Sequence, residues 1–387
     1  MRRSPPSRYF SKLASAVFSV SAGLYRYARQ KLGRPAPPEL YYVIPDHQWV
    51  TDWIGRYVTE NIARQFDWRT HLTSFPNWLS GQLLHYGEVG AYLHSLGAYR
   101  NARNFVVVSI FHAERSGRFP ELTAATERFL ENASQPGRIL TACSQMRERL
   151  VSWGIAAEKV TCIPLGVDLQ QFQPVSMSQR LEFRRRKGIP DDAICIGSFQ
   201  KDGEGWGEGL APKLIKGPDI FLQVVERLRA HYKLFVLLSA PARGFVKRGL
   251  EALGVPYRHE LLSNYLDIAN LYHCLDIYLM ASREEGGPQA ILESLATGVP
   301  LVATRTGLAP DVIQSRRNGL LADPEDVDGL SEGVAGLIEQ TEERQQLISN
   351  GLEDIKAYDW PKIAARYYHE VYAPVLWEEC PAGATDG

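Results

Sequence analysis

Two glutamates eight positions apart flank the segment of this chain with the clearest chemical pattern. They are Glu285 and Glu293, and between them lies a short turn that contains Gly286, Gly287, Pro288 and Gln289. An apolar run typical of a buried strand precedes the turn, and Pro288 suits the first position of a following helix, where no backbone donor is needed. Free N–H groups at a helix start attract phosphate, and glycines let an anion come close. The pattern predicts a phosphate site.

Glu293 is expected about one turn inside that helix, away from the apolar face that holds Ile291, Leu292 and Leu295. Its carboxylate is then free to face a cleft, where an ionised acceptor can take both hydroxyl protons of a ribose. Phosphate and ribose together indicate a nucleotide. The alternative is that both glutamates are solvated carboxylates on a charged helix flank. A hydrolase pair fits less well, because eight helical residues rise about 12 Å, whereas glycosidase carboxylates stand about 5 to 9.5 Å apart.

The elements that must position these residues follow an α/β pattern, in which short β-rich runs alternate with helical ones. Most of the predicted strands are continuously apolar, as expected for parallel strands covered on both faces; they are residues 41–44, 105–110, 139–142, 160–163, 194–197, 234–238, 276–280 and 301–303. Residues 218–231 predict a helix that begins at Pro218 and buries Ile220, Phe221 and Val224. A polar, proline-bracketed stretch at 166–192 separates two α/β halves.

The composition is that of an ordinary folded protein, since 45% hydrophobic and 22% charged residues exclude fibrous, collagen-like and largely disordered classes. The formal net charge of -1 supplies no field for nucleic acid, so no nucleic-acid partner is expected. Five cysteines, odd in number and without a CxxC spacing, indicate neither a disulfide framework nor structural zinc. We therefore expect a cytoplasmic protein.

The first 38 residues differ from the rest, because they are basic and contain no acidic residue. Apolar residues recur every three or four positions and predict an amphipathic helix; they are Phe10, Leu13, Val17, Val20, Leu24 and Tyr27. The apolar stretch at 13–25 is about half of the roughly 20 residues that a membrane helix needs. Two interpretations stay open: peripheral contact of residues 1–34 with anionic lipid at the inner face of the membrane, or a poorly ordered extension.

Residues 201–219 carry the glycine-rich string KDGEGWGEGLAPKLIKGPD. Its alternating glycines fit neither GxGxxG nor GxxxxGK[ST], so the fingerprints for dinucleotides and ATP are absent from it. An irregular loop of more than about 12 residues is uncommon unless it is functional or disordered. The string therefore indicates a functional loop.

With these residues in view, the chain resembles the retaining GT-B glycosyltransferases of the family 4 group, also known as glycosyl transferases group 1. The resemblance spans most of residues 40–375 and includes the strings TCIPLGVDLQQFQP, KGPDIFLQVVERL and NGLLADPED, which occur in the family's order. It implies two Rossmann-like parallel-sheet domains facing a central cleft. It also implies that Glu285 approaches the donor sugar, Glu293 binds the ribose, and backbone amides of the segment 286–289 hold the diphosphate.

We expect the chain to divide into five parts, of which the resemblance implies the two domains and the returning C-terminal helix. These are a basic amphipathic extension (1–38), an N-terminal acceptor-binding domain (39–175), a C-terminal nucleotide-sugar-binding domain (176–358), a C-terminal helix that returns to the N-terminal domain (359–378) and a tail (379–387).

The family also uses a basic pair to neutralise the diphosphate leaving group. Lys216, followed by Gly217, matches the lysine of that pair. An arginine is usual at the first position, but Phe199, Gln200 and Lys201 stand there, so Lys201 is the candidate, with Lys213 behind it. The alternative is that these are solvated loop lysines. A fixed cation near developing phosphate charge is catalytic through electrostatic preorganisation.

In the N-terminal half, His112 follows an apolar strand and resembles the family histidine that faces the sugar hydroxyls, although a lone histidine is more often structural. Weaker acceptor-side candidates are Asp46, Asp52, Gly55 and His85. The paired glycines usual in the loop after the first strand are missing, and only Gly55 is nearby. The two aspartates either bind acceptor hydroxyls or cap a turn and a helix at 55–65.

Asp326-Val327-Asp328 is the one Asp-x-Asp string of the kind that holds a metal in other glycosyltransferases. It lies at a predicted helix start, where capping explains it. We expect no catalytic metal and no cofactor. The expected partners are a nucleotide-sugar donor, which is a substrate, and a glycan or lipid-linked acceptor. The alternatives are a sugar phosphorylase of the same fold and a non-catalytic nucleotide-sugar sensor or scaffold.

Overall fold

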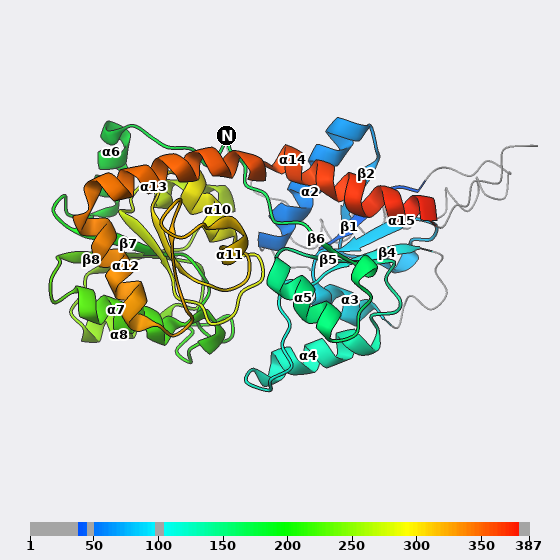
Figure 1. The fold of residues 1–387 in the computed structure, drawn as a ribbon, viewed down its shortest axis with the longest axis horizontal. Helices are drawn as coiled ribbons and strands as arrows, with labels where there is room; N and C mark the ends of the chain where they lie inside the picture. The colour runs from blue at the N-terminus through cyan, green and yellow to red at the C-terminus, as the bar shows by residue number, and fades with distance from the viewer. Residues whose placement is uncertain (1–37, 45–49, 97–103, 379–387) are drawn as a thin grey trace, which may run out of the picture. The chain divides into compact units, whose positions relative to one another are not determined.

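The computed structural model describes residues 38–44, 50–96 and 104–378 (Figure 1). The basic segment at 1–34 and Asp46 lie outside the described residues. Two compact units are present. Unit 1 contains the described residues up to Ala142, Met146–Ile163 and the chain from Trp360 on, and unit 2 contains Cys143–Gln145 and Pro164–Asp359. The continuous part of the second unit begins at Pro164, whereas the boundary was expected after 175.

Unit 1 is built on a six-stranded parallel sheet with the order β2-β1-β3-β4-β5-β6. Its elements are β1 (Leu40–Val43), α2 (Val50–Phe66), β2 (Thr70–Thr73), η1 (Pro76–Trp78), β3 (Leu83–Tyr86), α3 (Val89–Ser95), β4 (Phe105–Ser109), α4 (Pro120–Glu131), β5 (Arg138–Thr141), α5 (Ser144–Ser152), η2 (Ala157–Lys159), β6 (Val160–Cys162), α14 (Trp360–Arg366), the π-helix η6 (Tyr367–Tyr372) and α15 (Ala373–Glu378).

Unit 2 is built on a second six-stranded parallel sheet with the order β12-β11-β10-β7-β8-β9. Its elements are α6 (Met177–Lys187), β7 (Ile194–Ser198), η3 (Leu214–Lys216), α7 (Pro218–Leu228), β8 (Leu234–Ser239), α8 (Gly244–Ala252), β9 (Tyr257–Glu260), η4 (Tyr265–Ile268), α9 (Ala269–Tyr272), β10 (Ile277–Met280), α10 (Gln289–Ala296), β11 (Leu301–Thr304), α11 (Ala309–Val312), β12 (Leu320–Ala322), α12 (Val327–Glu339), α13 (Thr341–Asp354) and η5 (Ile355–Tyr358).

The predicted α/β class with two parallel sheets is confirmed, and all eight predicted strands are present to within a residue at each end. Four strands escaped prediction. Three of these, β2, β9 and β12, lie at sheet edges and are half-buried; β2 and β9 lack the continuous apolar run of a central strand, and the apolar run of β12 is only three residues long. The fourth, β3, is fully buried but is interrupted by His85.

One face of the unit 2 sheet is covered by α7, α8 and α12, which gather on the same side in Figure 1. Helix α7 begins at Pro218 as predicted and buries Ile220, Phe221 and Val224. These side chains join one apolar core with alternate residues of the strands, among them Ile196 and Leu279. Burial of this kind stabilises by about 25 cal/mol per Å² of apolar surface, and it holds the carboxyl ends of the strands in register.

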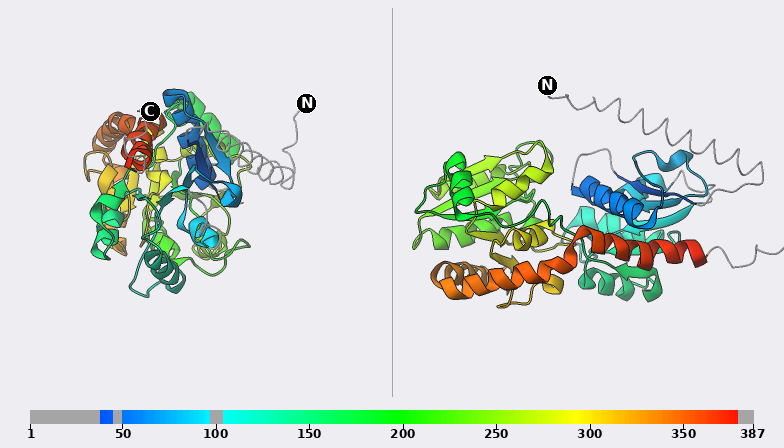
Figure 2. Two further views of the ribbon diagram at one scale, coloured as in Figure 1. Left: turned by 90° about the vertical axis from the view of Figure 1, so that its right-hand side faces the viewer. Right: turned by 90° about the horizontal axis from the view of Figure 1, so that it is seen from above.

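The C-terminal segment from α14 to α15 belongs to unit 1 and runs beside α2 (Figure 2). Aromatic stacking fixes it there: Tyr57 lies parallel to Trp360 with ring centroids 5.3 Å apart, and Phe66 lies parallel to Tyr368 at 3.9 Å. Stacked rings of this kind add about 0.5–1.5 kcal/mol each beyond their area burial.

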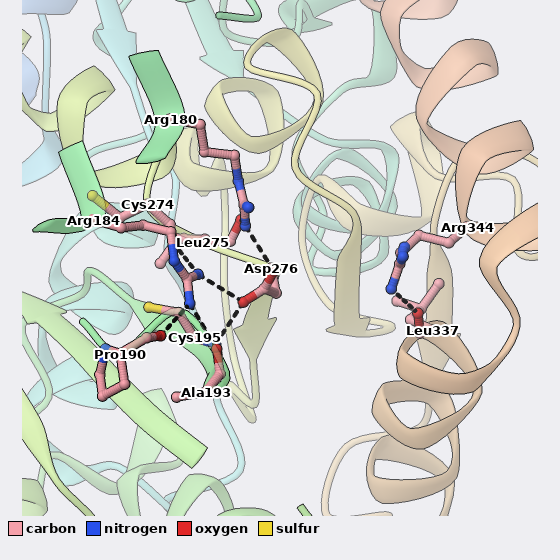
Figure 3. A network of polar contacts seen from close by, with 10 residues as sticks. All are labelled: Arg180, Arg184, Pro190, Ala193, Cys195, Cys274, Leu275, Asp276, Leu337 and Arg344. Atoms are coloured by element: carbon pink, nitrogen blue, oxygen red, sulfur yellow. Dashed lines mark hydrogen bonds and ion pairs between the residues drawn. The ribbon is translucent and has the colours of Figure 1, made fainter. Parts of the chain in front are cut away.

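A charged network lies at the amino ends of β7 and β10 in unit 2 (Figure 3). The carboxylate of Asp276 accepts from Arg180 at 2.7 Å, from Arg184 at 2.9 Å and from the Cys195 amide at 2.8 Å. Arg184 is almost fully buried and also donates to the carbonyls of Cys274, Pro190 and Ala193. The network therefore ties α6 to the sheet, with the donors of Arg184 directed to fixed acceptors.

Along the described ranges, no helix is long and apolar enough to cross a membrane.

Candidate functional site

The central feature of unit 2 is an ion pair between Lys216 and Glu285. The ammonium nitrogen of Lys216 lies 2.7 Å from both carboxylate oxygens of Glu285. Both side chains are largely covered, with 15% of Lys216 and 4% of Glu285 exposed. Lys216 ends η3 and Glu285 follows β10, so the structure brings together two residues 69 positions apart that the sequence assigned to one site.

Two neutral residues complete this arrangement. The hydroxyl of Ser282 donates to Glu285 at 2.8 Å and lies 3.2 Å from the side-chain oxygen of Gln200. The side-chain amide of Gln200 donates to the Lys216 carbonyl at 2.8 Å. Gln200 links the loops after β7 and β10 through these hydrogen bonds. Sequence reasoning did not assign this role to Gln200 or Ser282.

The turn after Lys216 requires glycine for two reasons. Gly217 has a positive φ of 62°, and a Cβ at this position would lie 1.9 Å from the Ala281 carbonyl oxygen. The Lys-Gly step therefore lets η3 pass directly against the end of β10. Arg283 strengthens the same junction, since it forms a two-pronged ion pair with Asp219 at the start of α7.

Lys213 and Lys201 add positive charge beside the pair. Burial lowers the pKa of Lys213, and the neighbouring ammonium groups of Lys216 and Lys201 lower it further. Lys201 lies with its nitrogen 5.0 Å from the ring centroid of Trp206. The structure thus places Lys213 near Lys201, Lys216 and Glu285, and a cluster of cations of this kind suits an anionic ligand.

The helix α10 supplies backbone donors close to the ion pair. It begins at Gln289, and Pro288 is its N-cap in an extended conformation, so the prediction of Pro288 as first helical residue was wrong by one position. The reason is the backbone of Pro288, whose ψ of 107° is not helical. The first amides of any helix lack intrahelical acceptors, so the helix itself does not satisfy the amides of Gln289 and Ala290.

Glu293 lies on a covered side of α10, and the expectation that it faces a cleft was wrong. Only 2% of the residue is exposed, because η4 and α9 cover this side of the helix. Its carboxyl group accepts from the hydroxyls of Tyr265 and Tyr272, the latter at 2.8 Å. Burial raises the pKa of Glu293 to about 8.

The sequence did not predict a buried ion pair that forms at Asp202, the residue after Lys201. Arg243 and Asp202 are almost fully buried, with Nε of the arginine 2.9 Å from Oδ1 of the aspartate. Arg243 also donates to the carbonyls of Ser198 and Ser239. The pair fixes the start of the glycine-rich segment to the end of β7. A buried arginine after a strand gives no periodic signal in the sequence.

In unit 1, His112 is half-buried in the loop that follows β4, three residues past Ser109. The carboxylate of Glu114 holds this loop together, because it accepts from the amides of Ser116 at 2.8 Å and Phe119 at 3.3 Å. Burial raises the pKa of Glu114, but these hydrogen bonds and those from Ser116 and Thr123 hydroxyls lower it overall. The site role predicted for His112 stays a prediction.

His85 lies in the core of unit 1 and offers no exposed surface to an acceptor. Its ring nitrogens lie 2.5 Å from the Tyr372 hydroxyl and 2.8 Å from the Ser109 hydroxyl. Burial lowers the pKa of His85 to about 3, so the ring is neutral. The acceptor-side prediction is corrected here, because His85 links β3 to β4 and to the C-terminal segment.

Asp52 and Gly55 both lie inside α2, which begins at Val50 and not near 55 as expected. Asp52 is in the first turn, where an acidic side chain complements the helix dipole. Gly55 is buried against β1, and a Cβ there would lie 2.7 Å from Cδ1 of Tyr42. Gly55 is therefore a packing residue of the helix and not part of an acceptor loop.

Asp326 caps α12, as predicted, by accepting from the Gly329 amide at 2.8 Å. Asp328 forms an ion pair with Arg227. Across the ranges that the structure describes, no group of three or more His, Cys, Asp and Glu side chains is arranged to hold a metal ion.

Residues 210–354 match the family model of glycosyl transferases group 1. This stretch includes Lys213, Lys216, Glu285 and Glu293. The chain is 29% identical over 234 residues to a D-inositol 3-phosphate glycosyltransferase of Xylanimonas cellulosilytica, a match that covers 57% of this chain and 52% of the relative. It is 24% identical over 255 residues to the sulfoquinovosyl transferase SQD2 of Arabidopsis thaliana, covering 65% of this chain and 47% of that protein. The chain thus spans about half the length of these curated relatives.

The fold is also similar to solved structures. The crystal structure of Anabaena Alr3699/HepE in complex with UDP-glucose aligns with a TM-score of 0.70 at 15% identity, over 87% of this chain and 99% of that chain. A glycosyltransferase from Rickettsia africae aligns with a TM-score of 0.65 at 15% identity, over 88% of this chain and 98% of that one. These similarities, with the two parallel sheets, establish the predicted GT-B fold of two Rossmann-like domains.

Proposed function

We propose that this chain is a glycosyltransferase that moves a sugar from a nucleotide-sugar donor to an acceptor hydroxyl in glycan, polysaccharide or glycolipid synthesis, with retention at the anomeric carbon. The observation that carries the proposal is the Lys216–Glu285 pair, flanked by Lys201 and Lys213, next to the amino end of α10. The match of residues 210–354 to a glycosyltransferase family supports it.

The chemistry follows from these groups. The donor diphosphate binds the lysines and the first amides of α10, which lie where negative charge grows as the bond between the anomeric carbon and the diphosphate breaks. The acceptor oxygen forms the new bond on the same face, and its proton passes to the leaving diphosphate. Lys216 then exchanges part of its contact with Glu285 for contact with phosphate, which leaves Glu285 to accept from sugar hydroxyls.

Glu293 is proposed to bind the ribose. Its carboxyl group already accepts from two hydroxyls, those of Tyr265 and Tyr272. Tyr265 is the half-buried member, so a ribose hydroxyl replaces it when donor binds, and η4 shifts away. Glu293→Ala is therefore expected to weaken nucleotide binding, and unchanged affinity by calorimetry would remove the ribose assignment.

The reaction is proposed to need no catalytic metal, with the lysines and the helix start neutralising the diphosphate. Activity should be the same before and after treatment with EDTA. Loss of activity with EDTA and its recovery on addition of Mn²⁺ would overturn this part of the proposal.

Screening UDP-, GDP- and ADP-sugars for thermal stabilisation tests the function most directly. A true donor at 100 times its dissociation constant adds about 2.7 kcal/mol of stability. Turnover of that donor should release the nucleoside diphosphate, and proton NMR should find the anomeric configuration of the donor in the product. Stabilisation by none of the three classes would refute the proposal, and inversion would refute the retaining mechanism.

A further inference from the structure

The glycine-rich segment at 201–213 contains no strand, as its sequence indicated, but antiparallel contacts close its base, and we call it the hairpin. Gly203 and Pro212 form an antiparallel bridge, the Glu204 amide donates to the Ala211 carbonyl at 2.9 Å, and the Lys213 amide donates to the Asp202 carbonyl at 2.7 Å. One end follows β7 directly, and the other leads into η3 and Lys216. The hairpin therefore begins and ends next to residues of the candidate site.

The base and one arm of the hairpin are fixed. Asp202 is held by the buried Arg243. Gly209 has a φ of 72°, and a Cβ there would lie 2.3 Å from the Ala242 carbonyl oxygen, so this arm lies flat against the segment before α8. The amides of Gly244 and Phe245 donate to the carbonyls of Glu208 and Gly209. The tip between the arms therefore has a defined position.

The tip displays an aromatic ring flanked by carboxylates. Trp206 is 64% exposed, and Glu204 and Glu208 on either side of it are exposed as well. An indole is usually buried unless it serves an interface or a ligand. Lys201 contacts this ring, with its nitrogen 5.0 Å from the centroid. Lys201 therefore contacts the aromatic ring at the tip and also belongs to the lysine cluster.

Resting on the proposed function, we infer that Trp206, with Glu204 and Glu208, forms a subsite for a pyranose ring. The C–H face of a sugar packs on an aromatic ring, while carboxylates accept from its hydroxyls. A phosphate oxygen bound by Lys201 lies about 2.8 Å from its nitrogen, which puts a sugar linked to that phosphate within reach of the indole. The ring belongs to the donor sugar or to the acceptor.

A lipid surface fits this tip less well, although Leu210 and Leu214 are also exposed. Glu204 and Glu208 give the tip negative charge, which anionic headgroups repel. Carboxylates beside an exposed aromatic ring suit hydroxyl-rich ligands instead. The charge of the tip thus favours a sugar.

The test compares Trp206→Ala and Trp206→Phe with wild type, and uses Leu261→Ala as a matched control, since Leu261 is 68% exposed outside the hairpin. Calorimetry measures the affinity of UDP and UDP-glucose, and of GDP and GDP-mannose, and a glycan array probed with the bound nucleotide present measures acceptor binding. We expect Trp206→Ala to weaken binding of the sugar-bearing ligand roughly 3- to 10-fold, to leave the free nucleotide unchanged, and to be largely rescued by phenylalanine.

The outcomes separate the sources of the sugar. Weaker binding of the nucleotide-sugar alone assigns the subsite to the donor, and weaker glycan binding alone assigns it to the acceptor. If Trp206→Ala binds every probe as tightly as wild type, the subsite is overturned and the proposed function stands. The same holds if Trp206→Ala loses as much affinity for the free nucleotide as for the nucleotide-sugar. Failure of wild type to bind any nucleotide overturns the proposed function itself. The melting temperatures of all variants show whether each remains folded.

Discussion

The two ends of strands β7 and β10 carry charged networks of opposite character. At the amino ends, Asp276 is matched by Arg180, Arg184 and a backbone amide, and the donors of Arg184 are directed to fixed acceptors. At the carboxyl ends, Lys216 holds Glu285 while Lys201 and Lys213 lie nearby and repel one another. The first network is complete within the chain. In the second, the ammonium groups of Lys216 and Lys201 lower the pKa of Lys213, while the carboxylates of Glu204 and Glu285 raise it.

This difference separates a structural role from a functional one. A buried network in which donors and acceptors are matched rigidifies the fold and has no use for a ligand. A cluster of like charges destabilises the protein slightly until an anion arrives, so it is retained where an anion binds. The comparison predicts that damage to the amino-end network affects folding, and damage to the carboxyl-end network affects turnover.

The largest effect is expected from Asp276→Ala. The change leaves the guanidinium of Arg184, of which 3% is exposed, buried beside no carboxylate. Loss of one partner of a buried pair costs about 3–5 kcal/mol of the free energy of unfolding, to be measured by urea denaturation. Nucleotide affinity of the folded fraction should be unchanged. A variant as stable as wild type would show that this network is not structural.

Lys216→Ala should reduce turnover by about 10²- to 10³-fold, equivalent to roughly 3–4 kcal/mol of transition-state stabilisation. It should also lower stability, because Glu285 is left buried without its partner, so rates are compared well below each melting temperature. Lys233→Ala is the control, since this lysine pairs with Asp192 at the surface. Full turnover by Lys216→Ala would place the chemistry elsewhere.

Glu293→Gln should change the pH dependence of stability. The pKa of Glu293 is raised to about 8 from 4.5, so the folded state holds its proton more tightly than the unfolded state. The stabilisation is complete below pH 4.5 and is lost as pH rises through 8, with a slope of at most about 1.4 kcal/mol per pH unit. The glutamine variant should lack this slope and exceed wild type in stability at pH 9.

If the free energy of unfolding depends on pH in the same way for wild type and Glu293→Gln from pH 5 to 9, the raised pKa of Glu293 is contradicted. This result would mean that the carboxyl group is solvated and that Tyr265 and Tyr272 do not enclose it.

The smallest effect is expected from Lys233→Ala itself. Its ion pair with Asp192 is exposed on both sides, at 60% and 70%, so solvent screens it. Urea denaturation and turnover should both match wild type within error. A measurable loss in either would show that exposure alone does not separate important pairs from unimportant ones in this protein.

Sequence reasoning succeeded where a local pattern reports a local requirement. The apolar runs of the central strands, Pro218 at the start of α7 and Asp326 at the start of α12 each reflect a constraint among near neighbours. It failed where the constraint comes from residues distant along the chain. The location of His85 depends on Tyr372, 287 positions away, and that of Gly55 depends on Tyr42 in the preceding strand β1.

Composition and motif alone determined the class of fold and predicted the residues that bind a phosphate, because strand periodicity, a glycine-proline helix start and a lysine-glycine step depend on consecutive positions. Only the tertiary structure decided how charged each group is. Burial raises the pKa of Glu293 and lowers that of His85, and the fold makes Lys216 the partner of Glu285. The physical reason is that solvation and electrostatic energies depend on distances in space, which spacing along the chain does not contain.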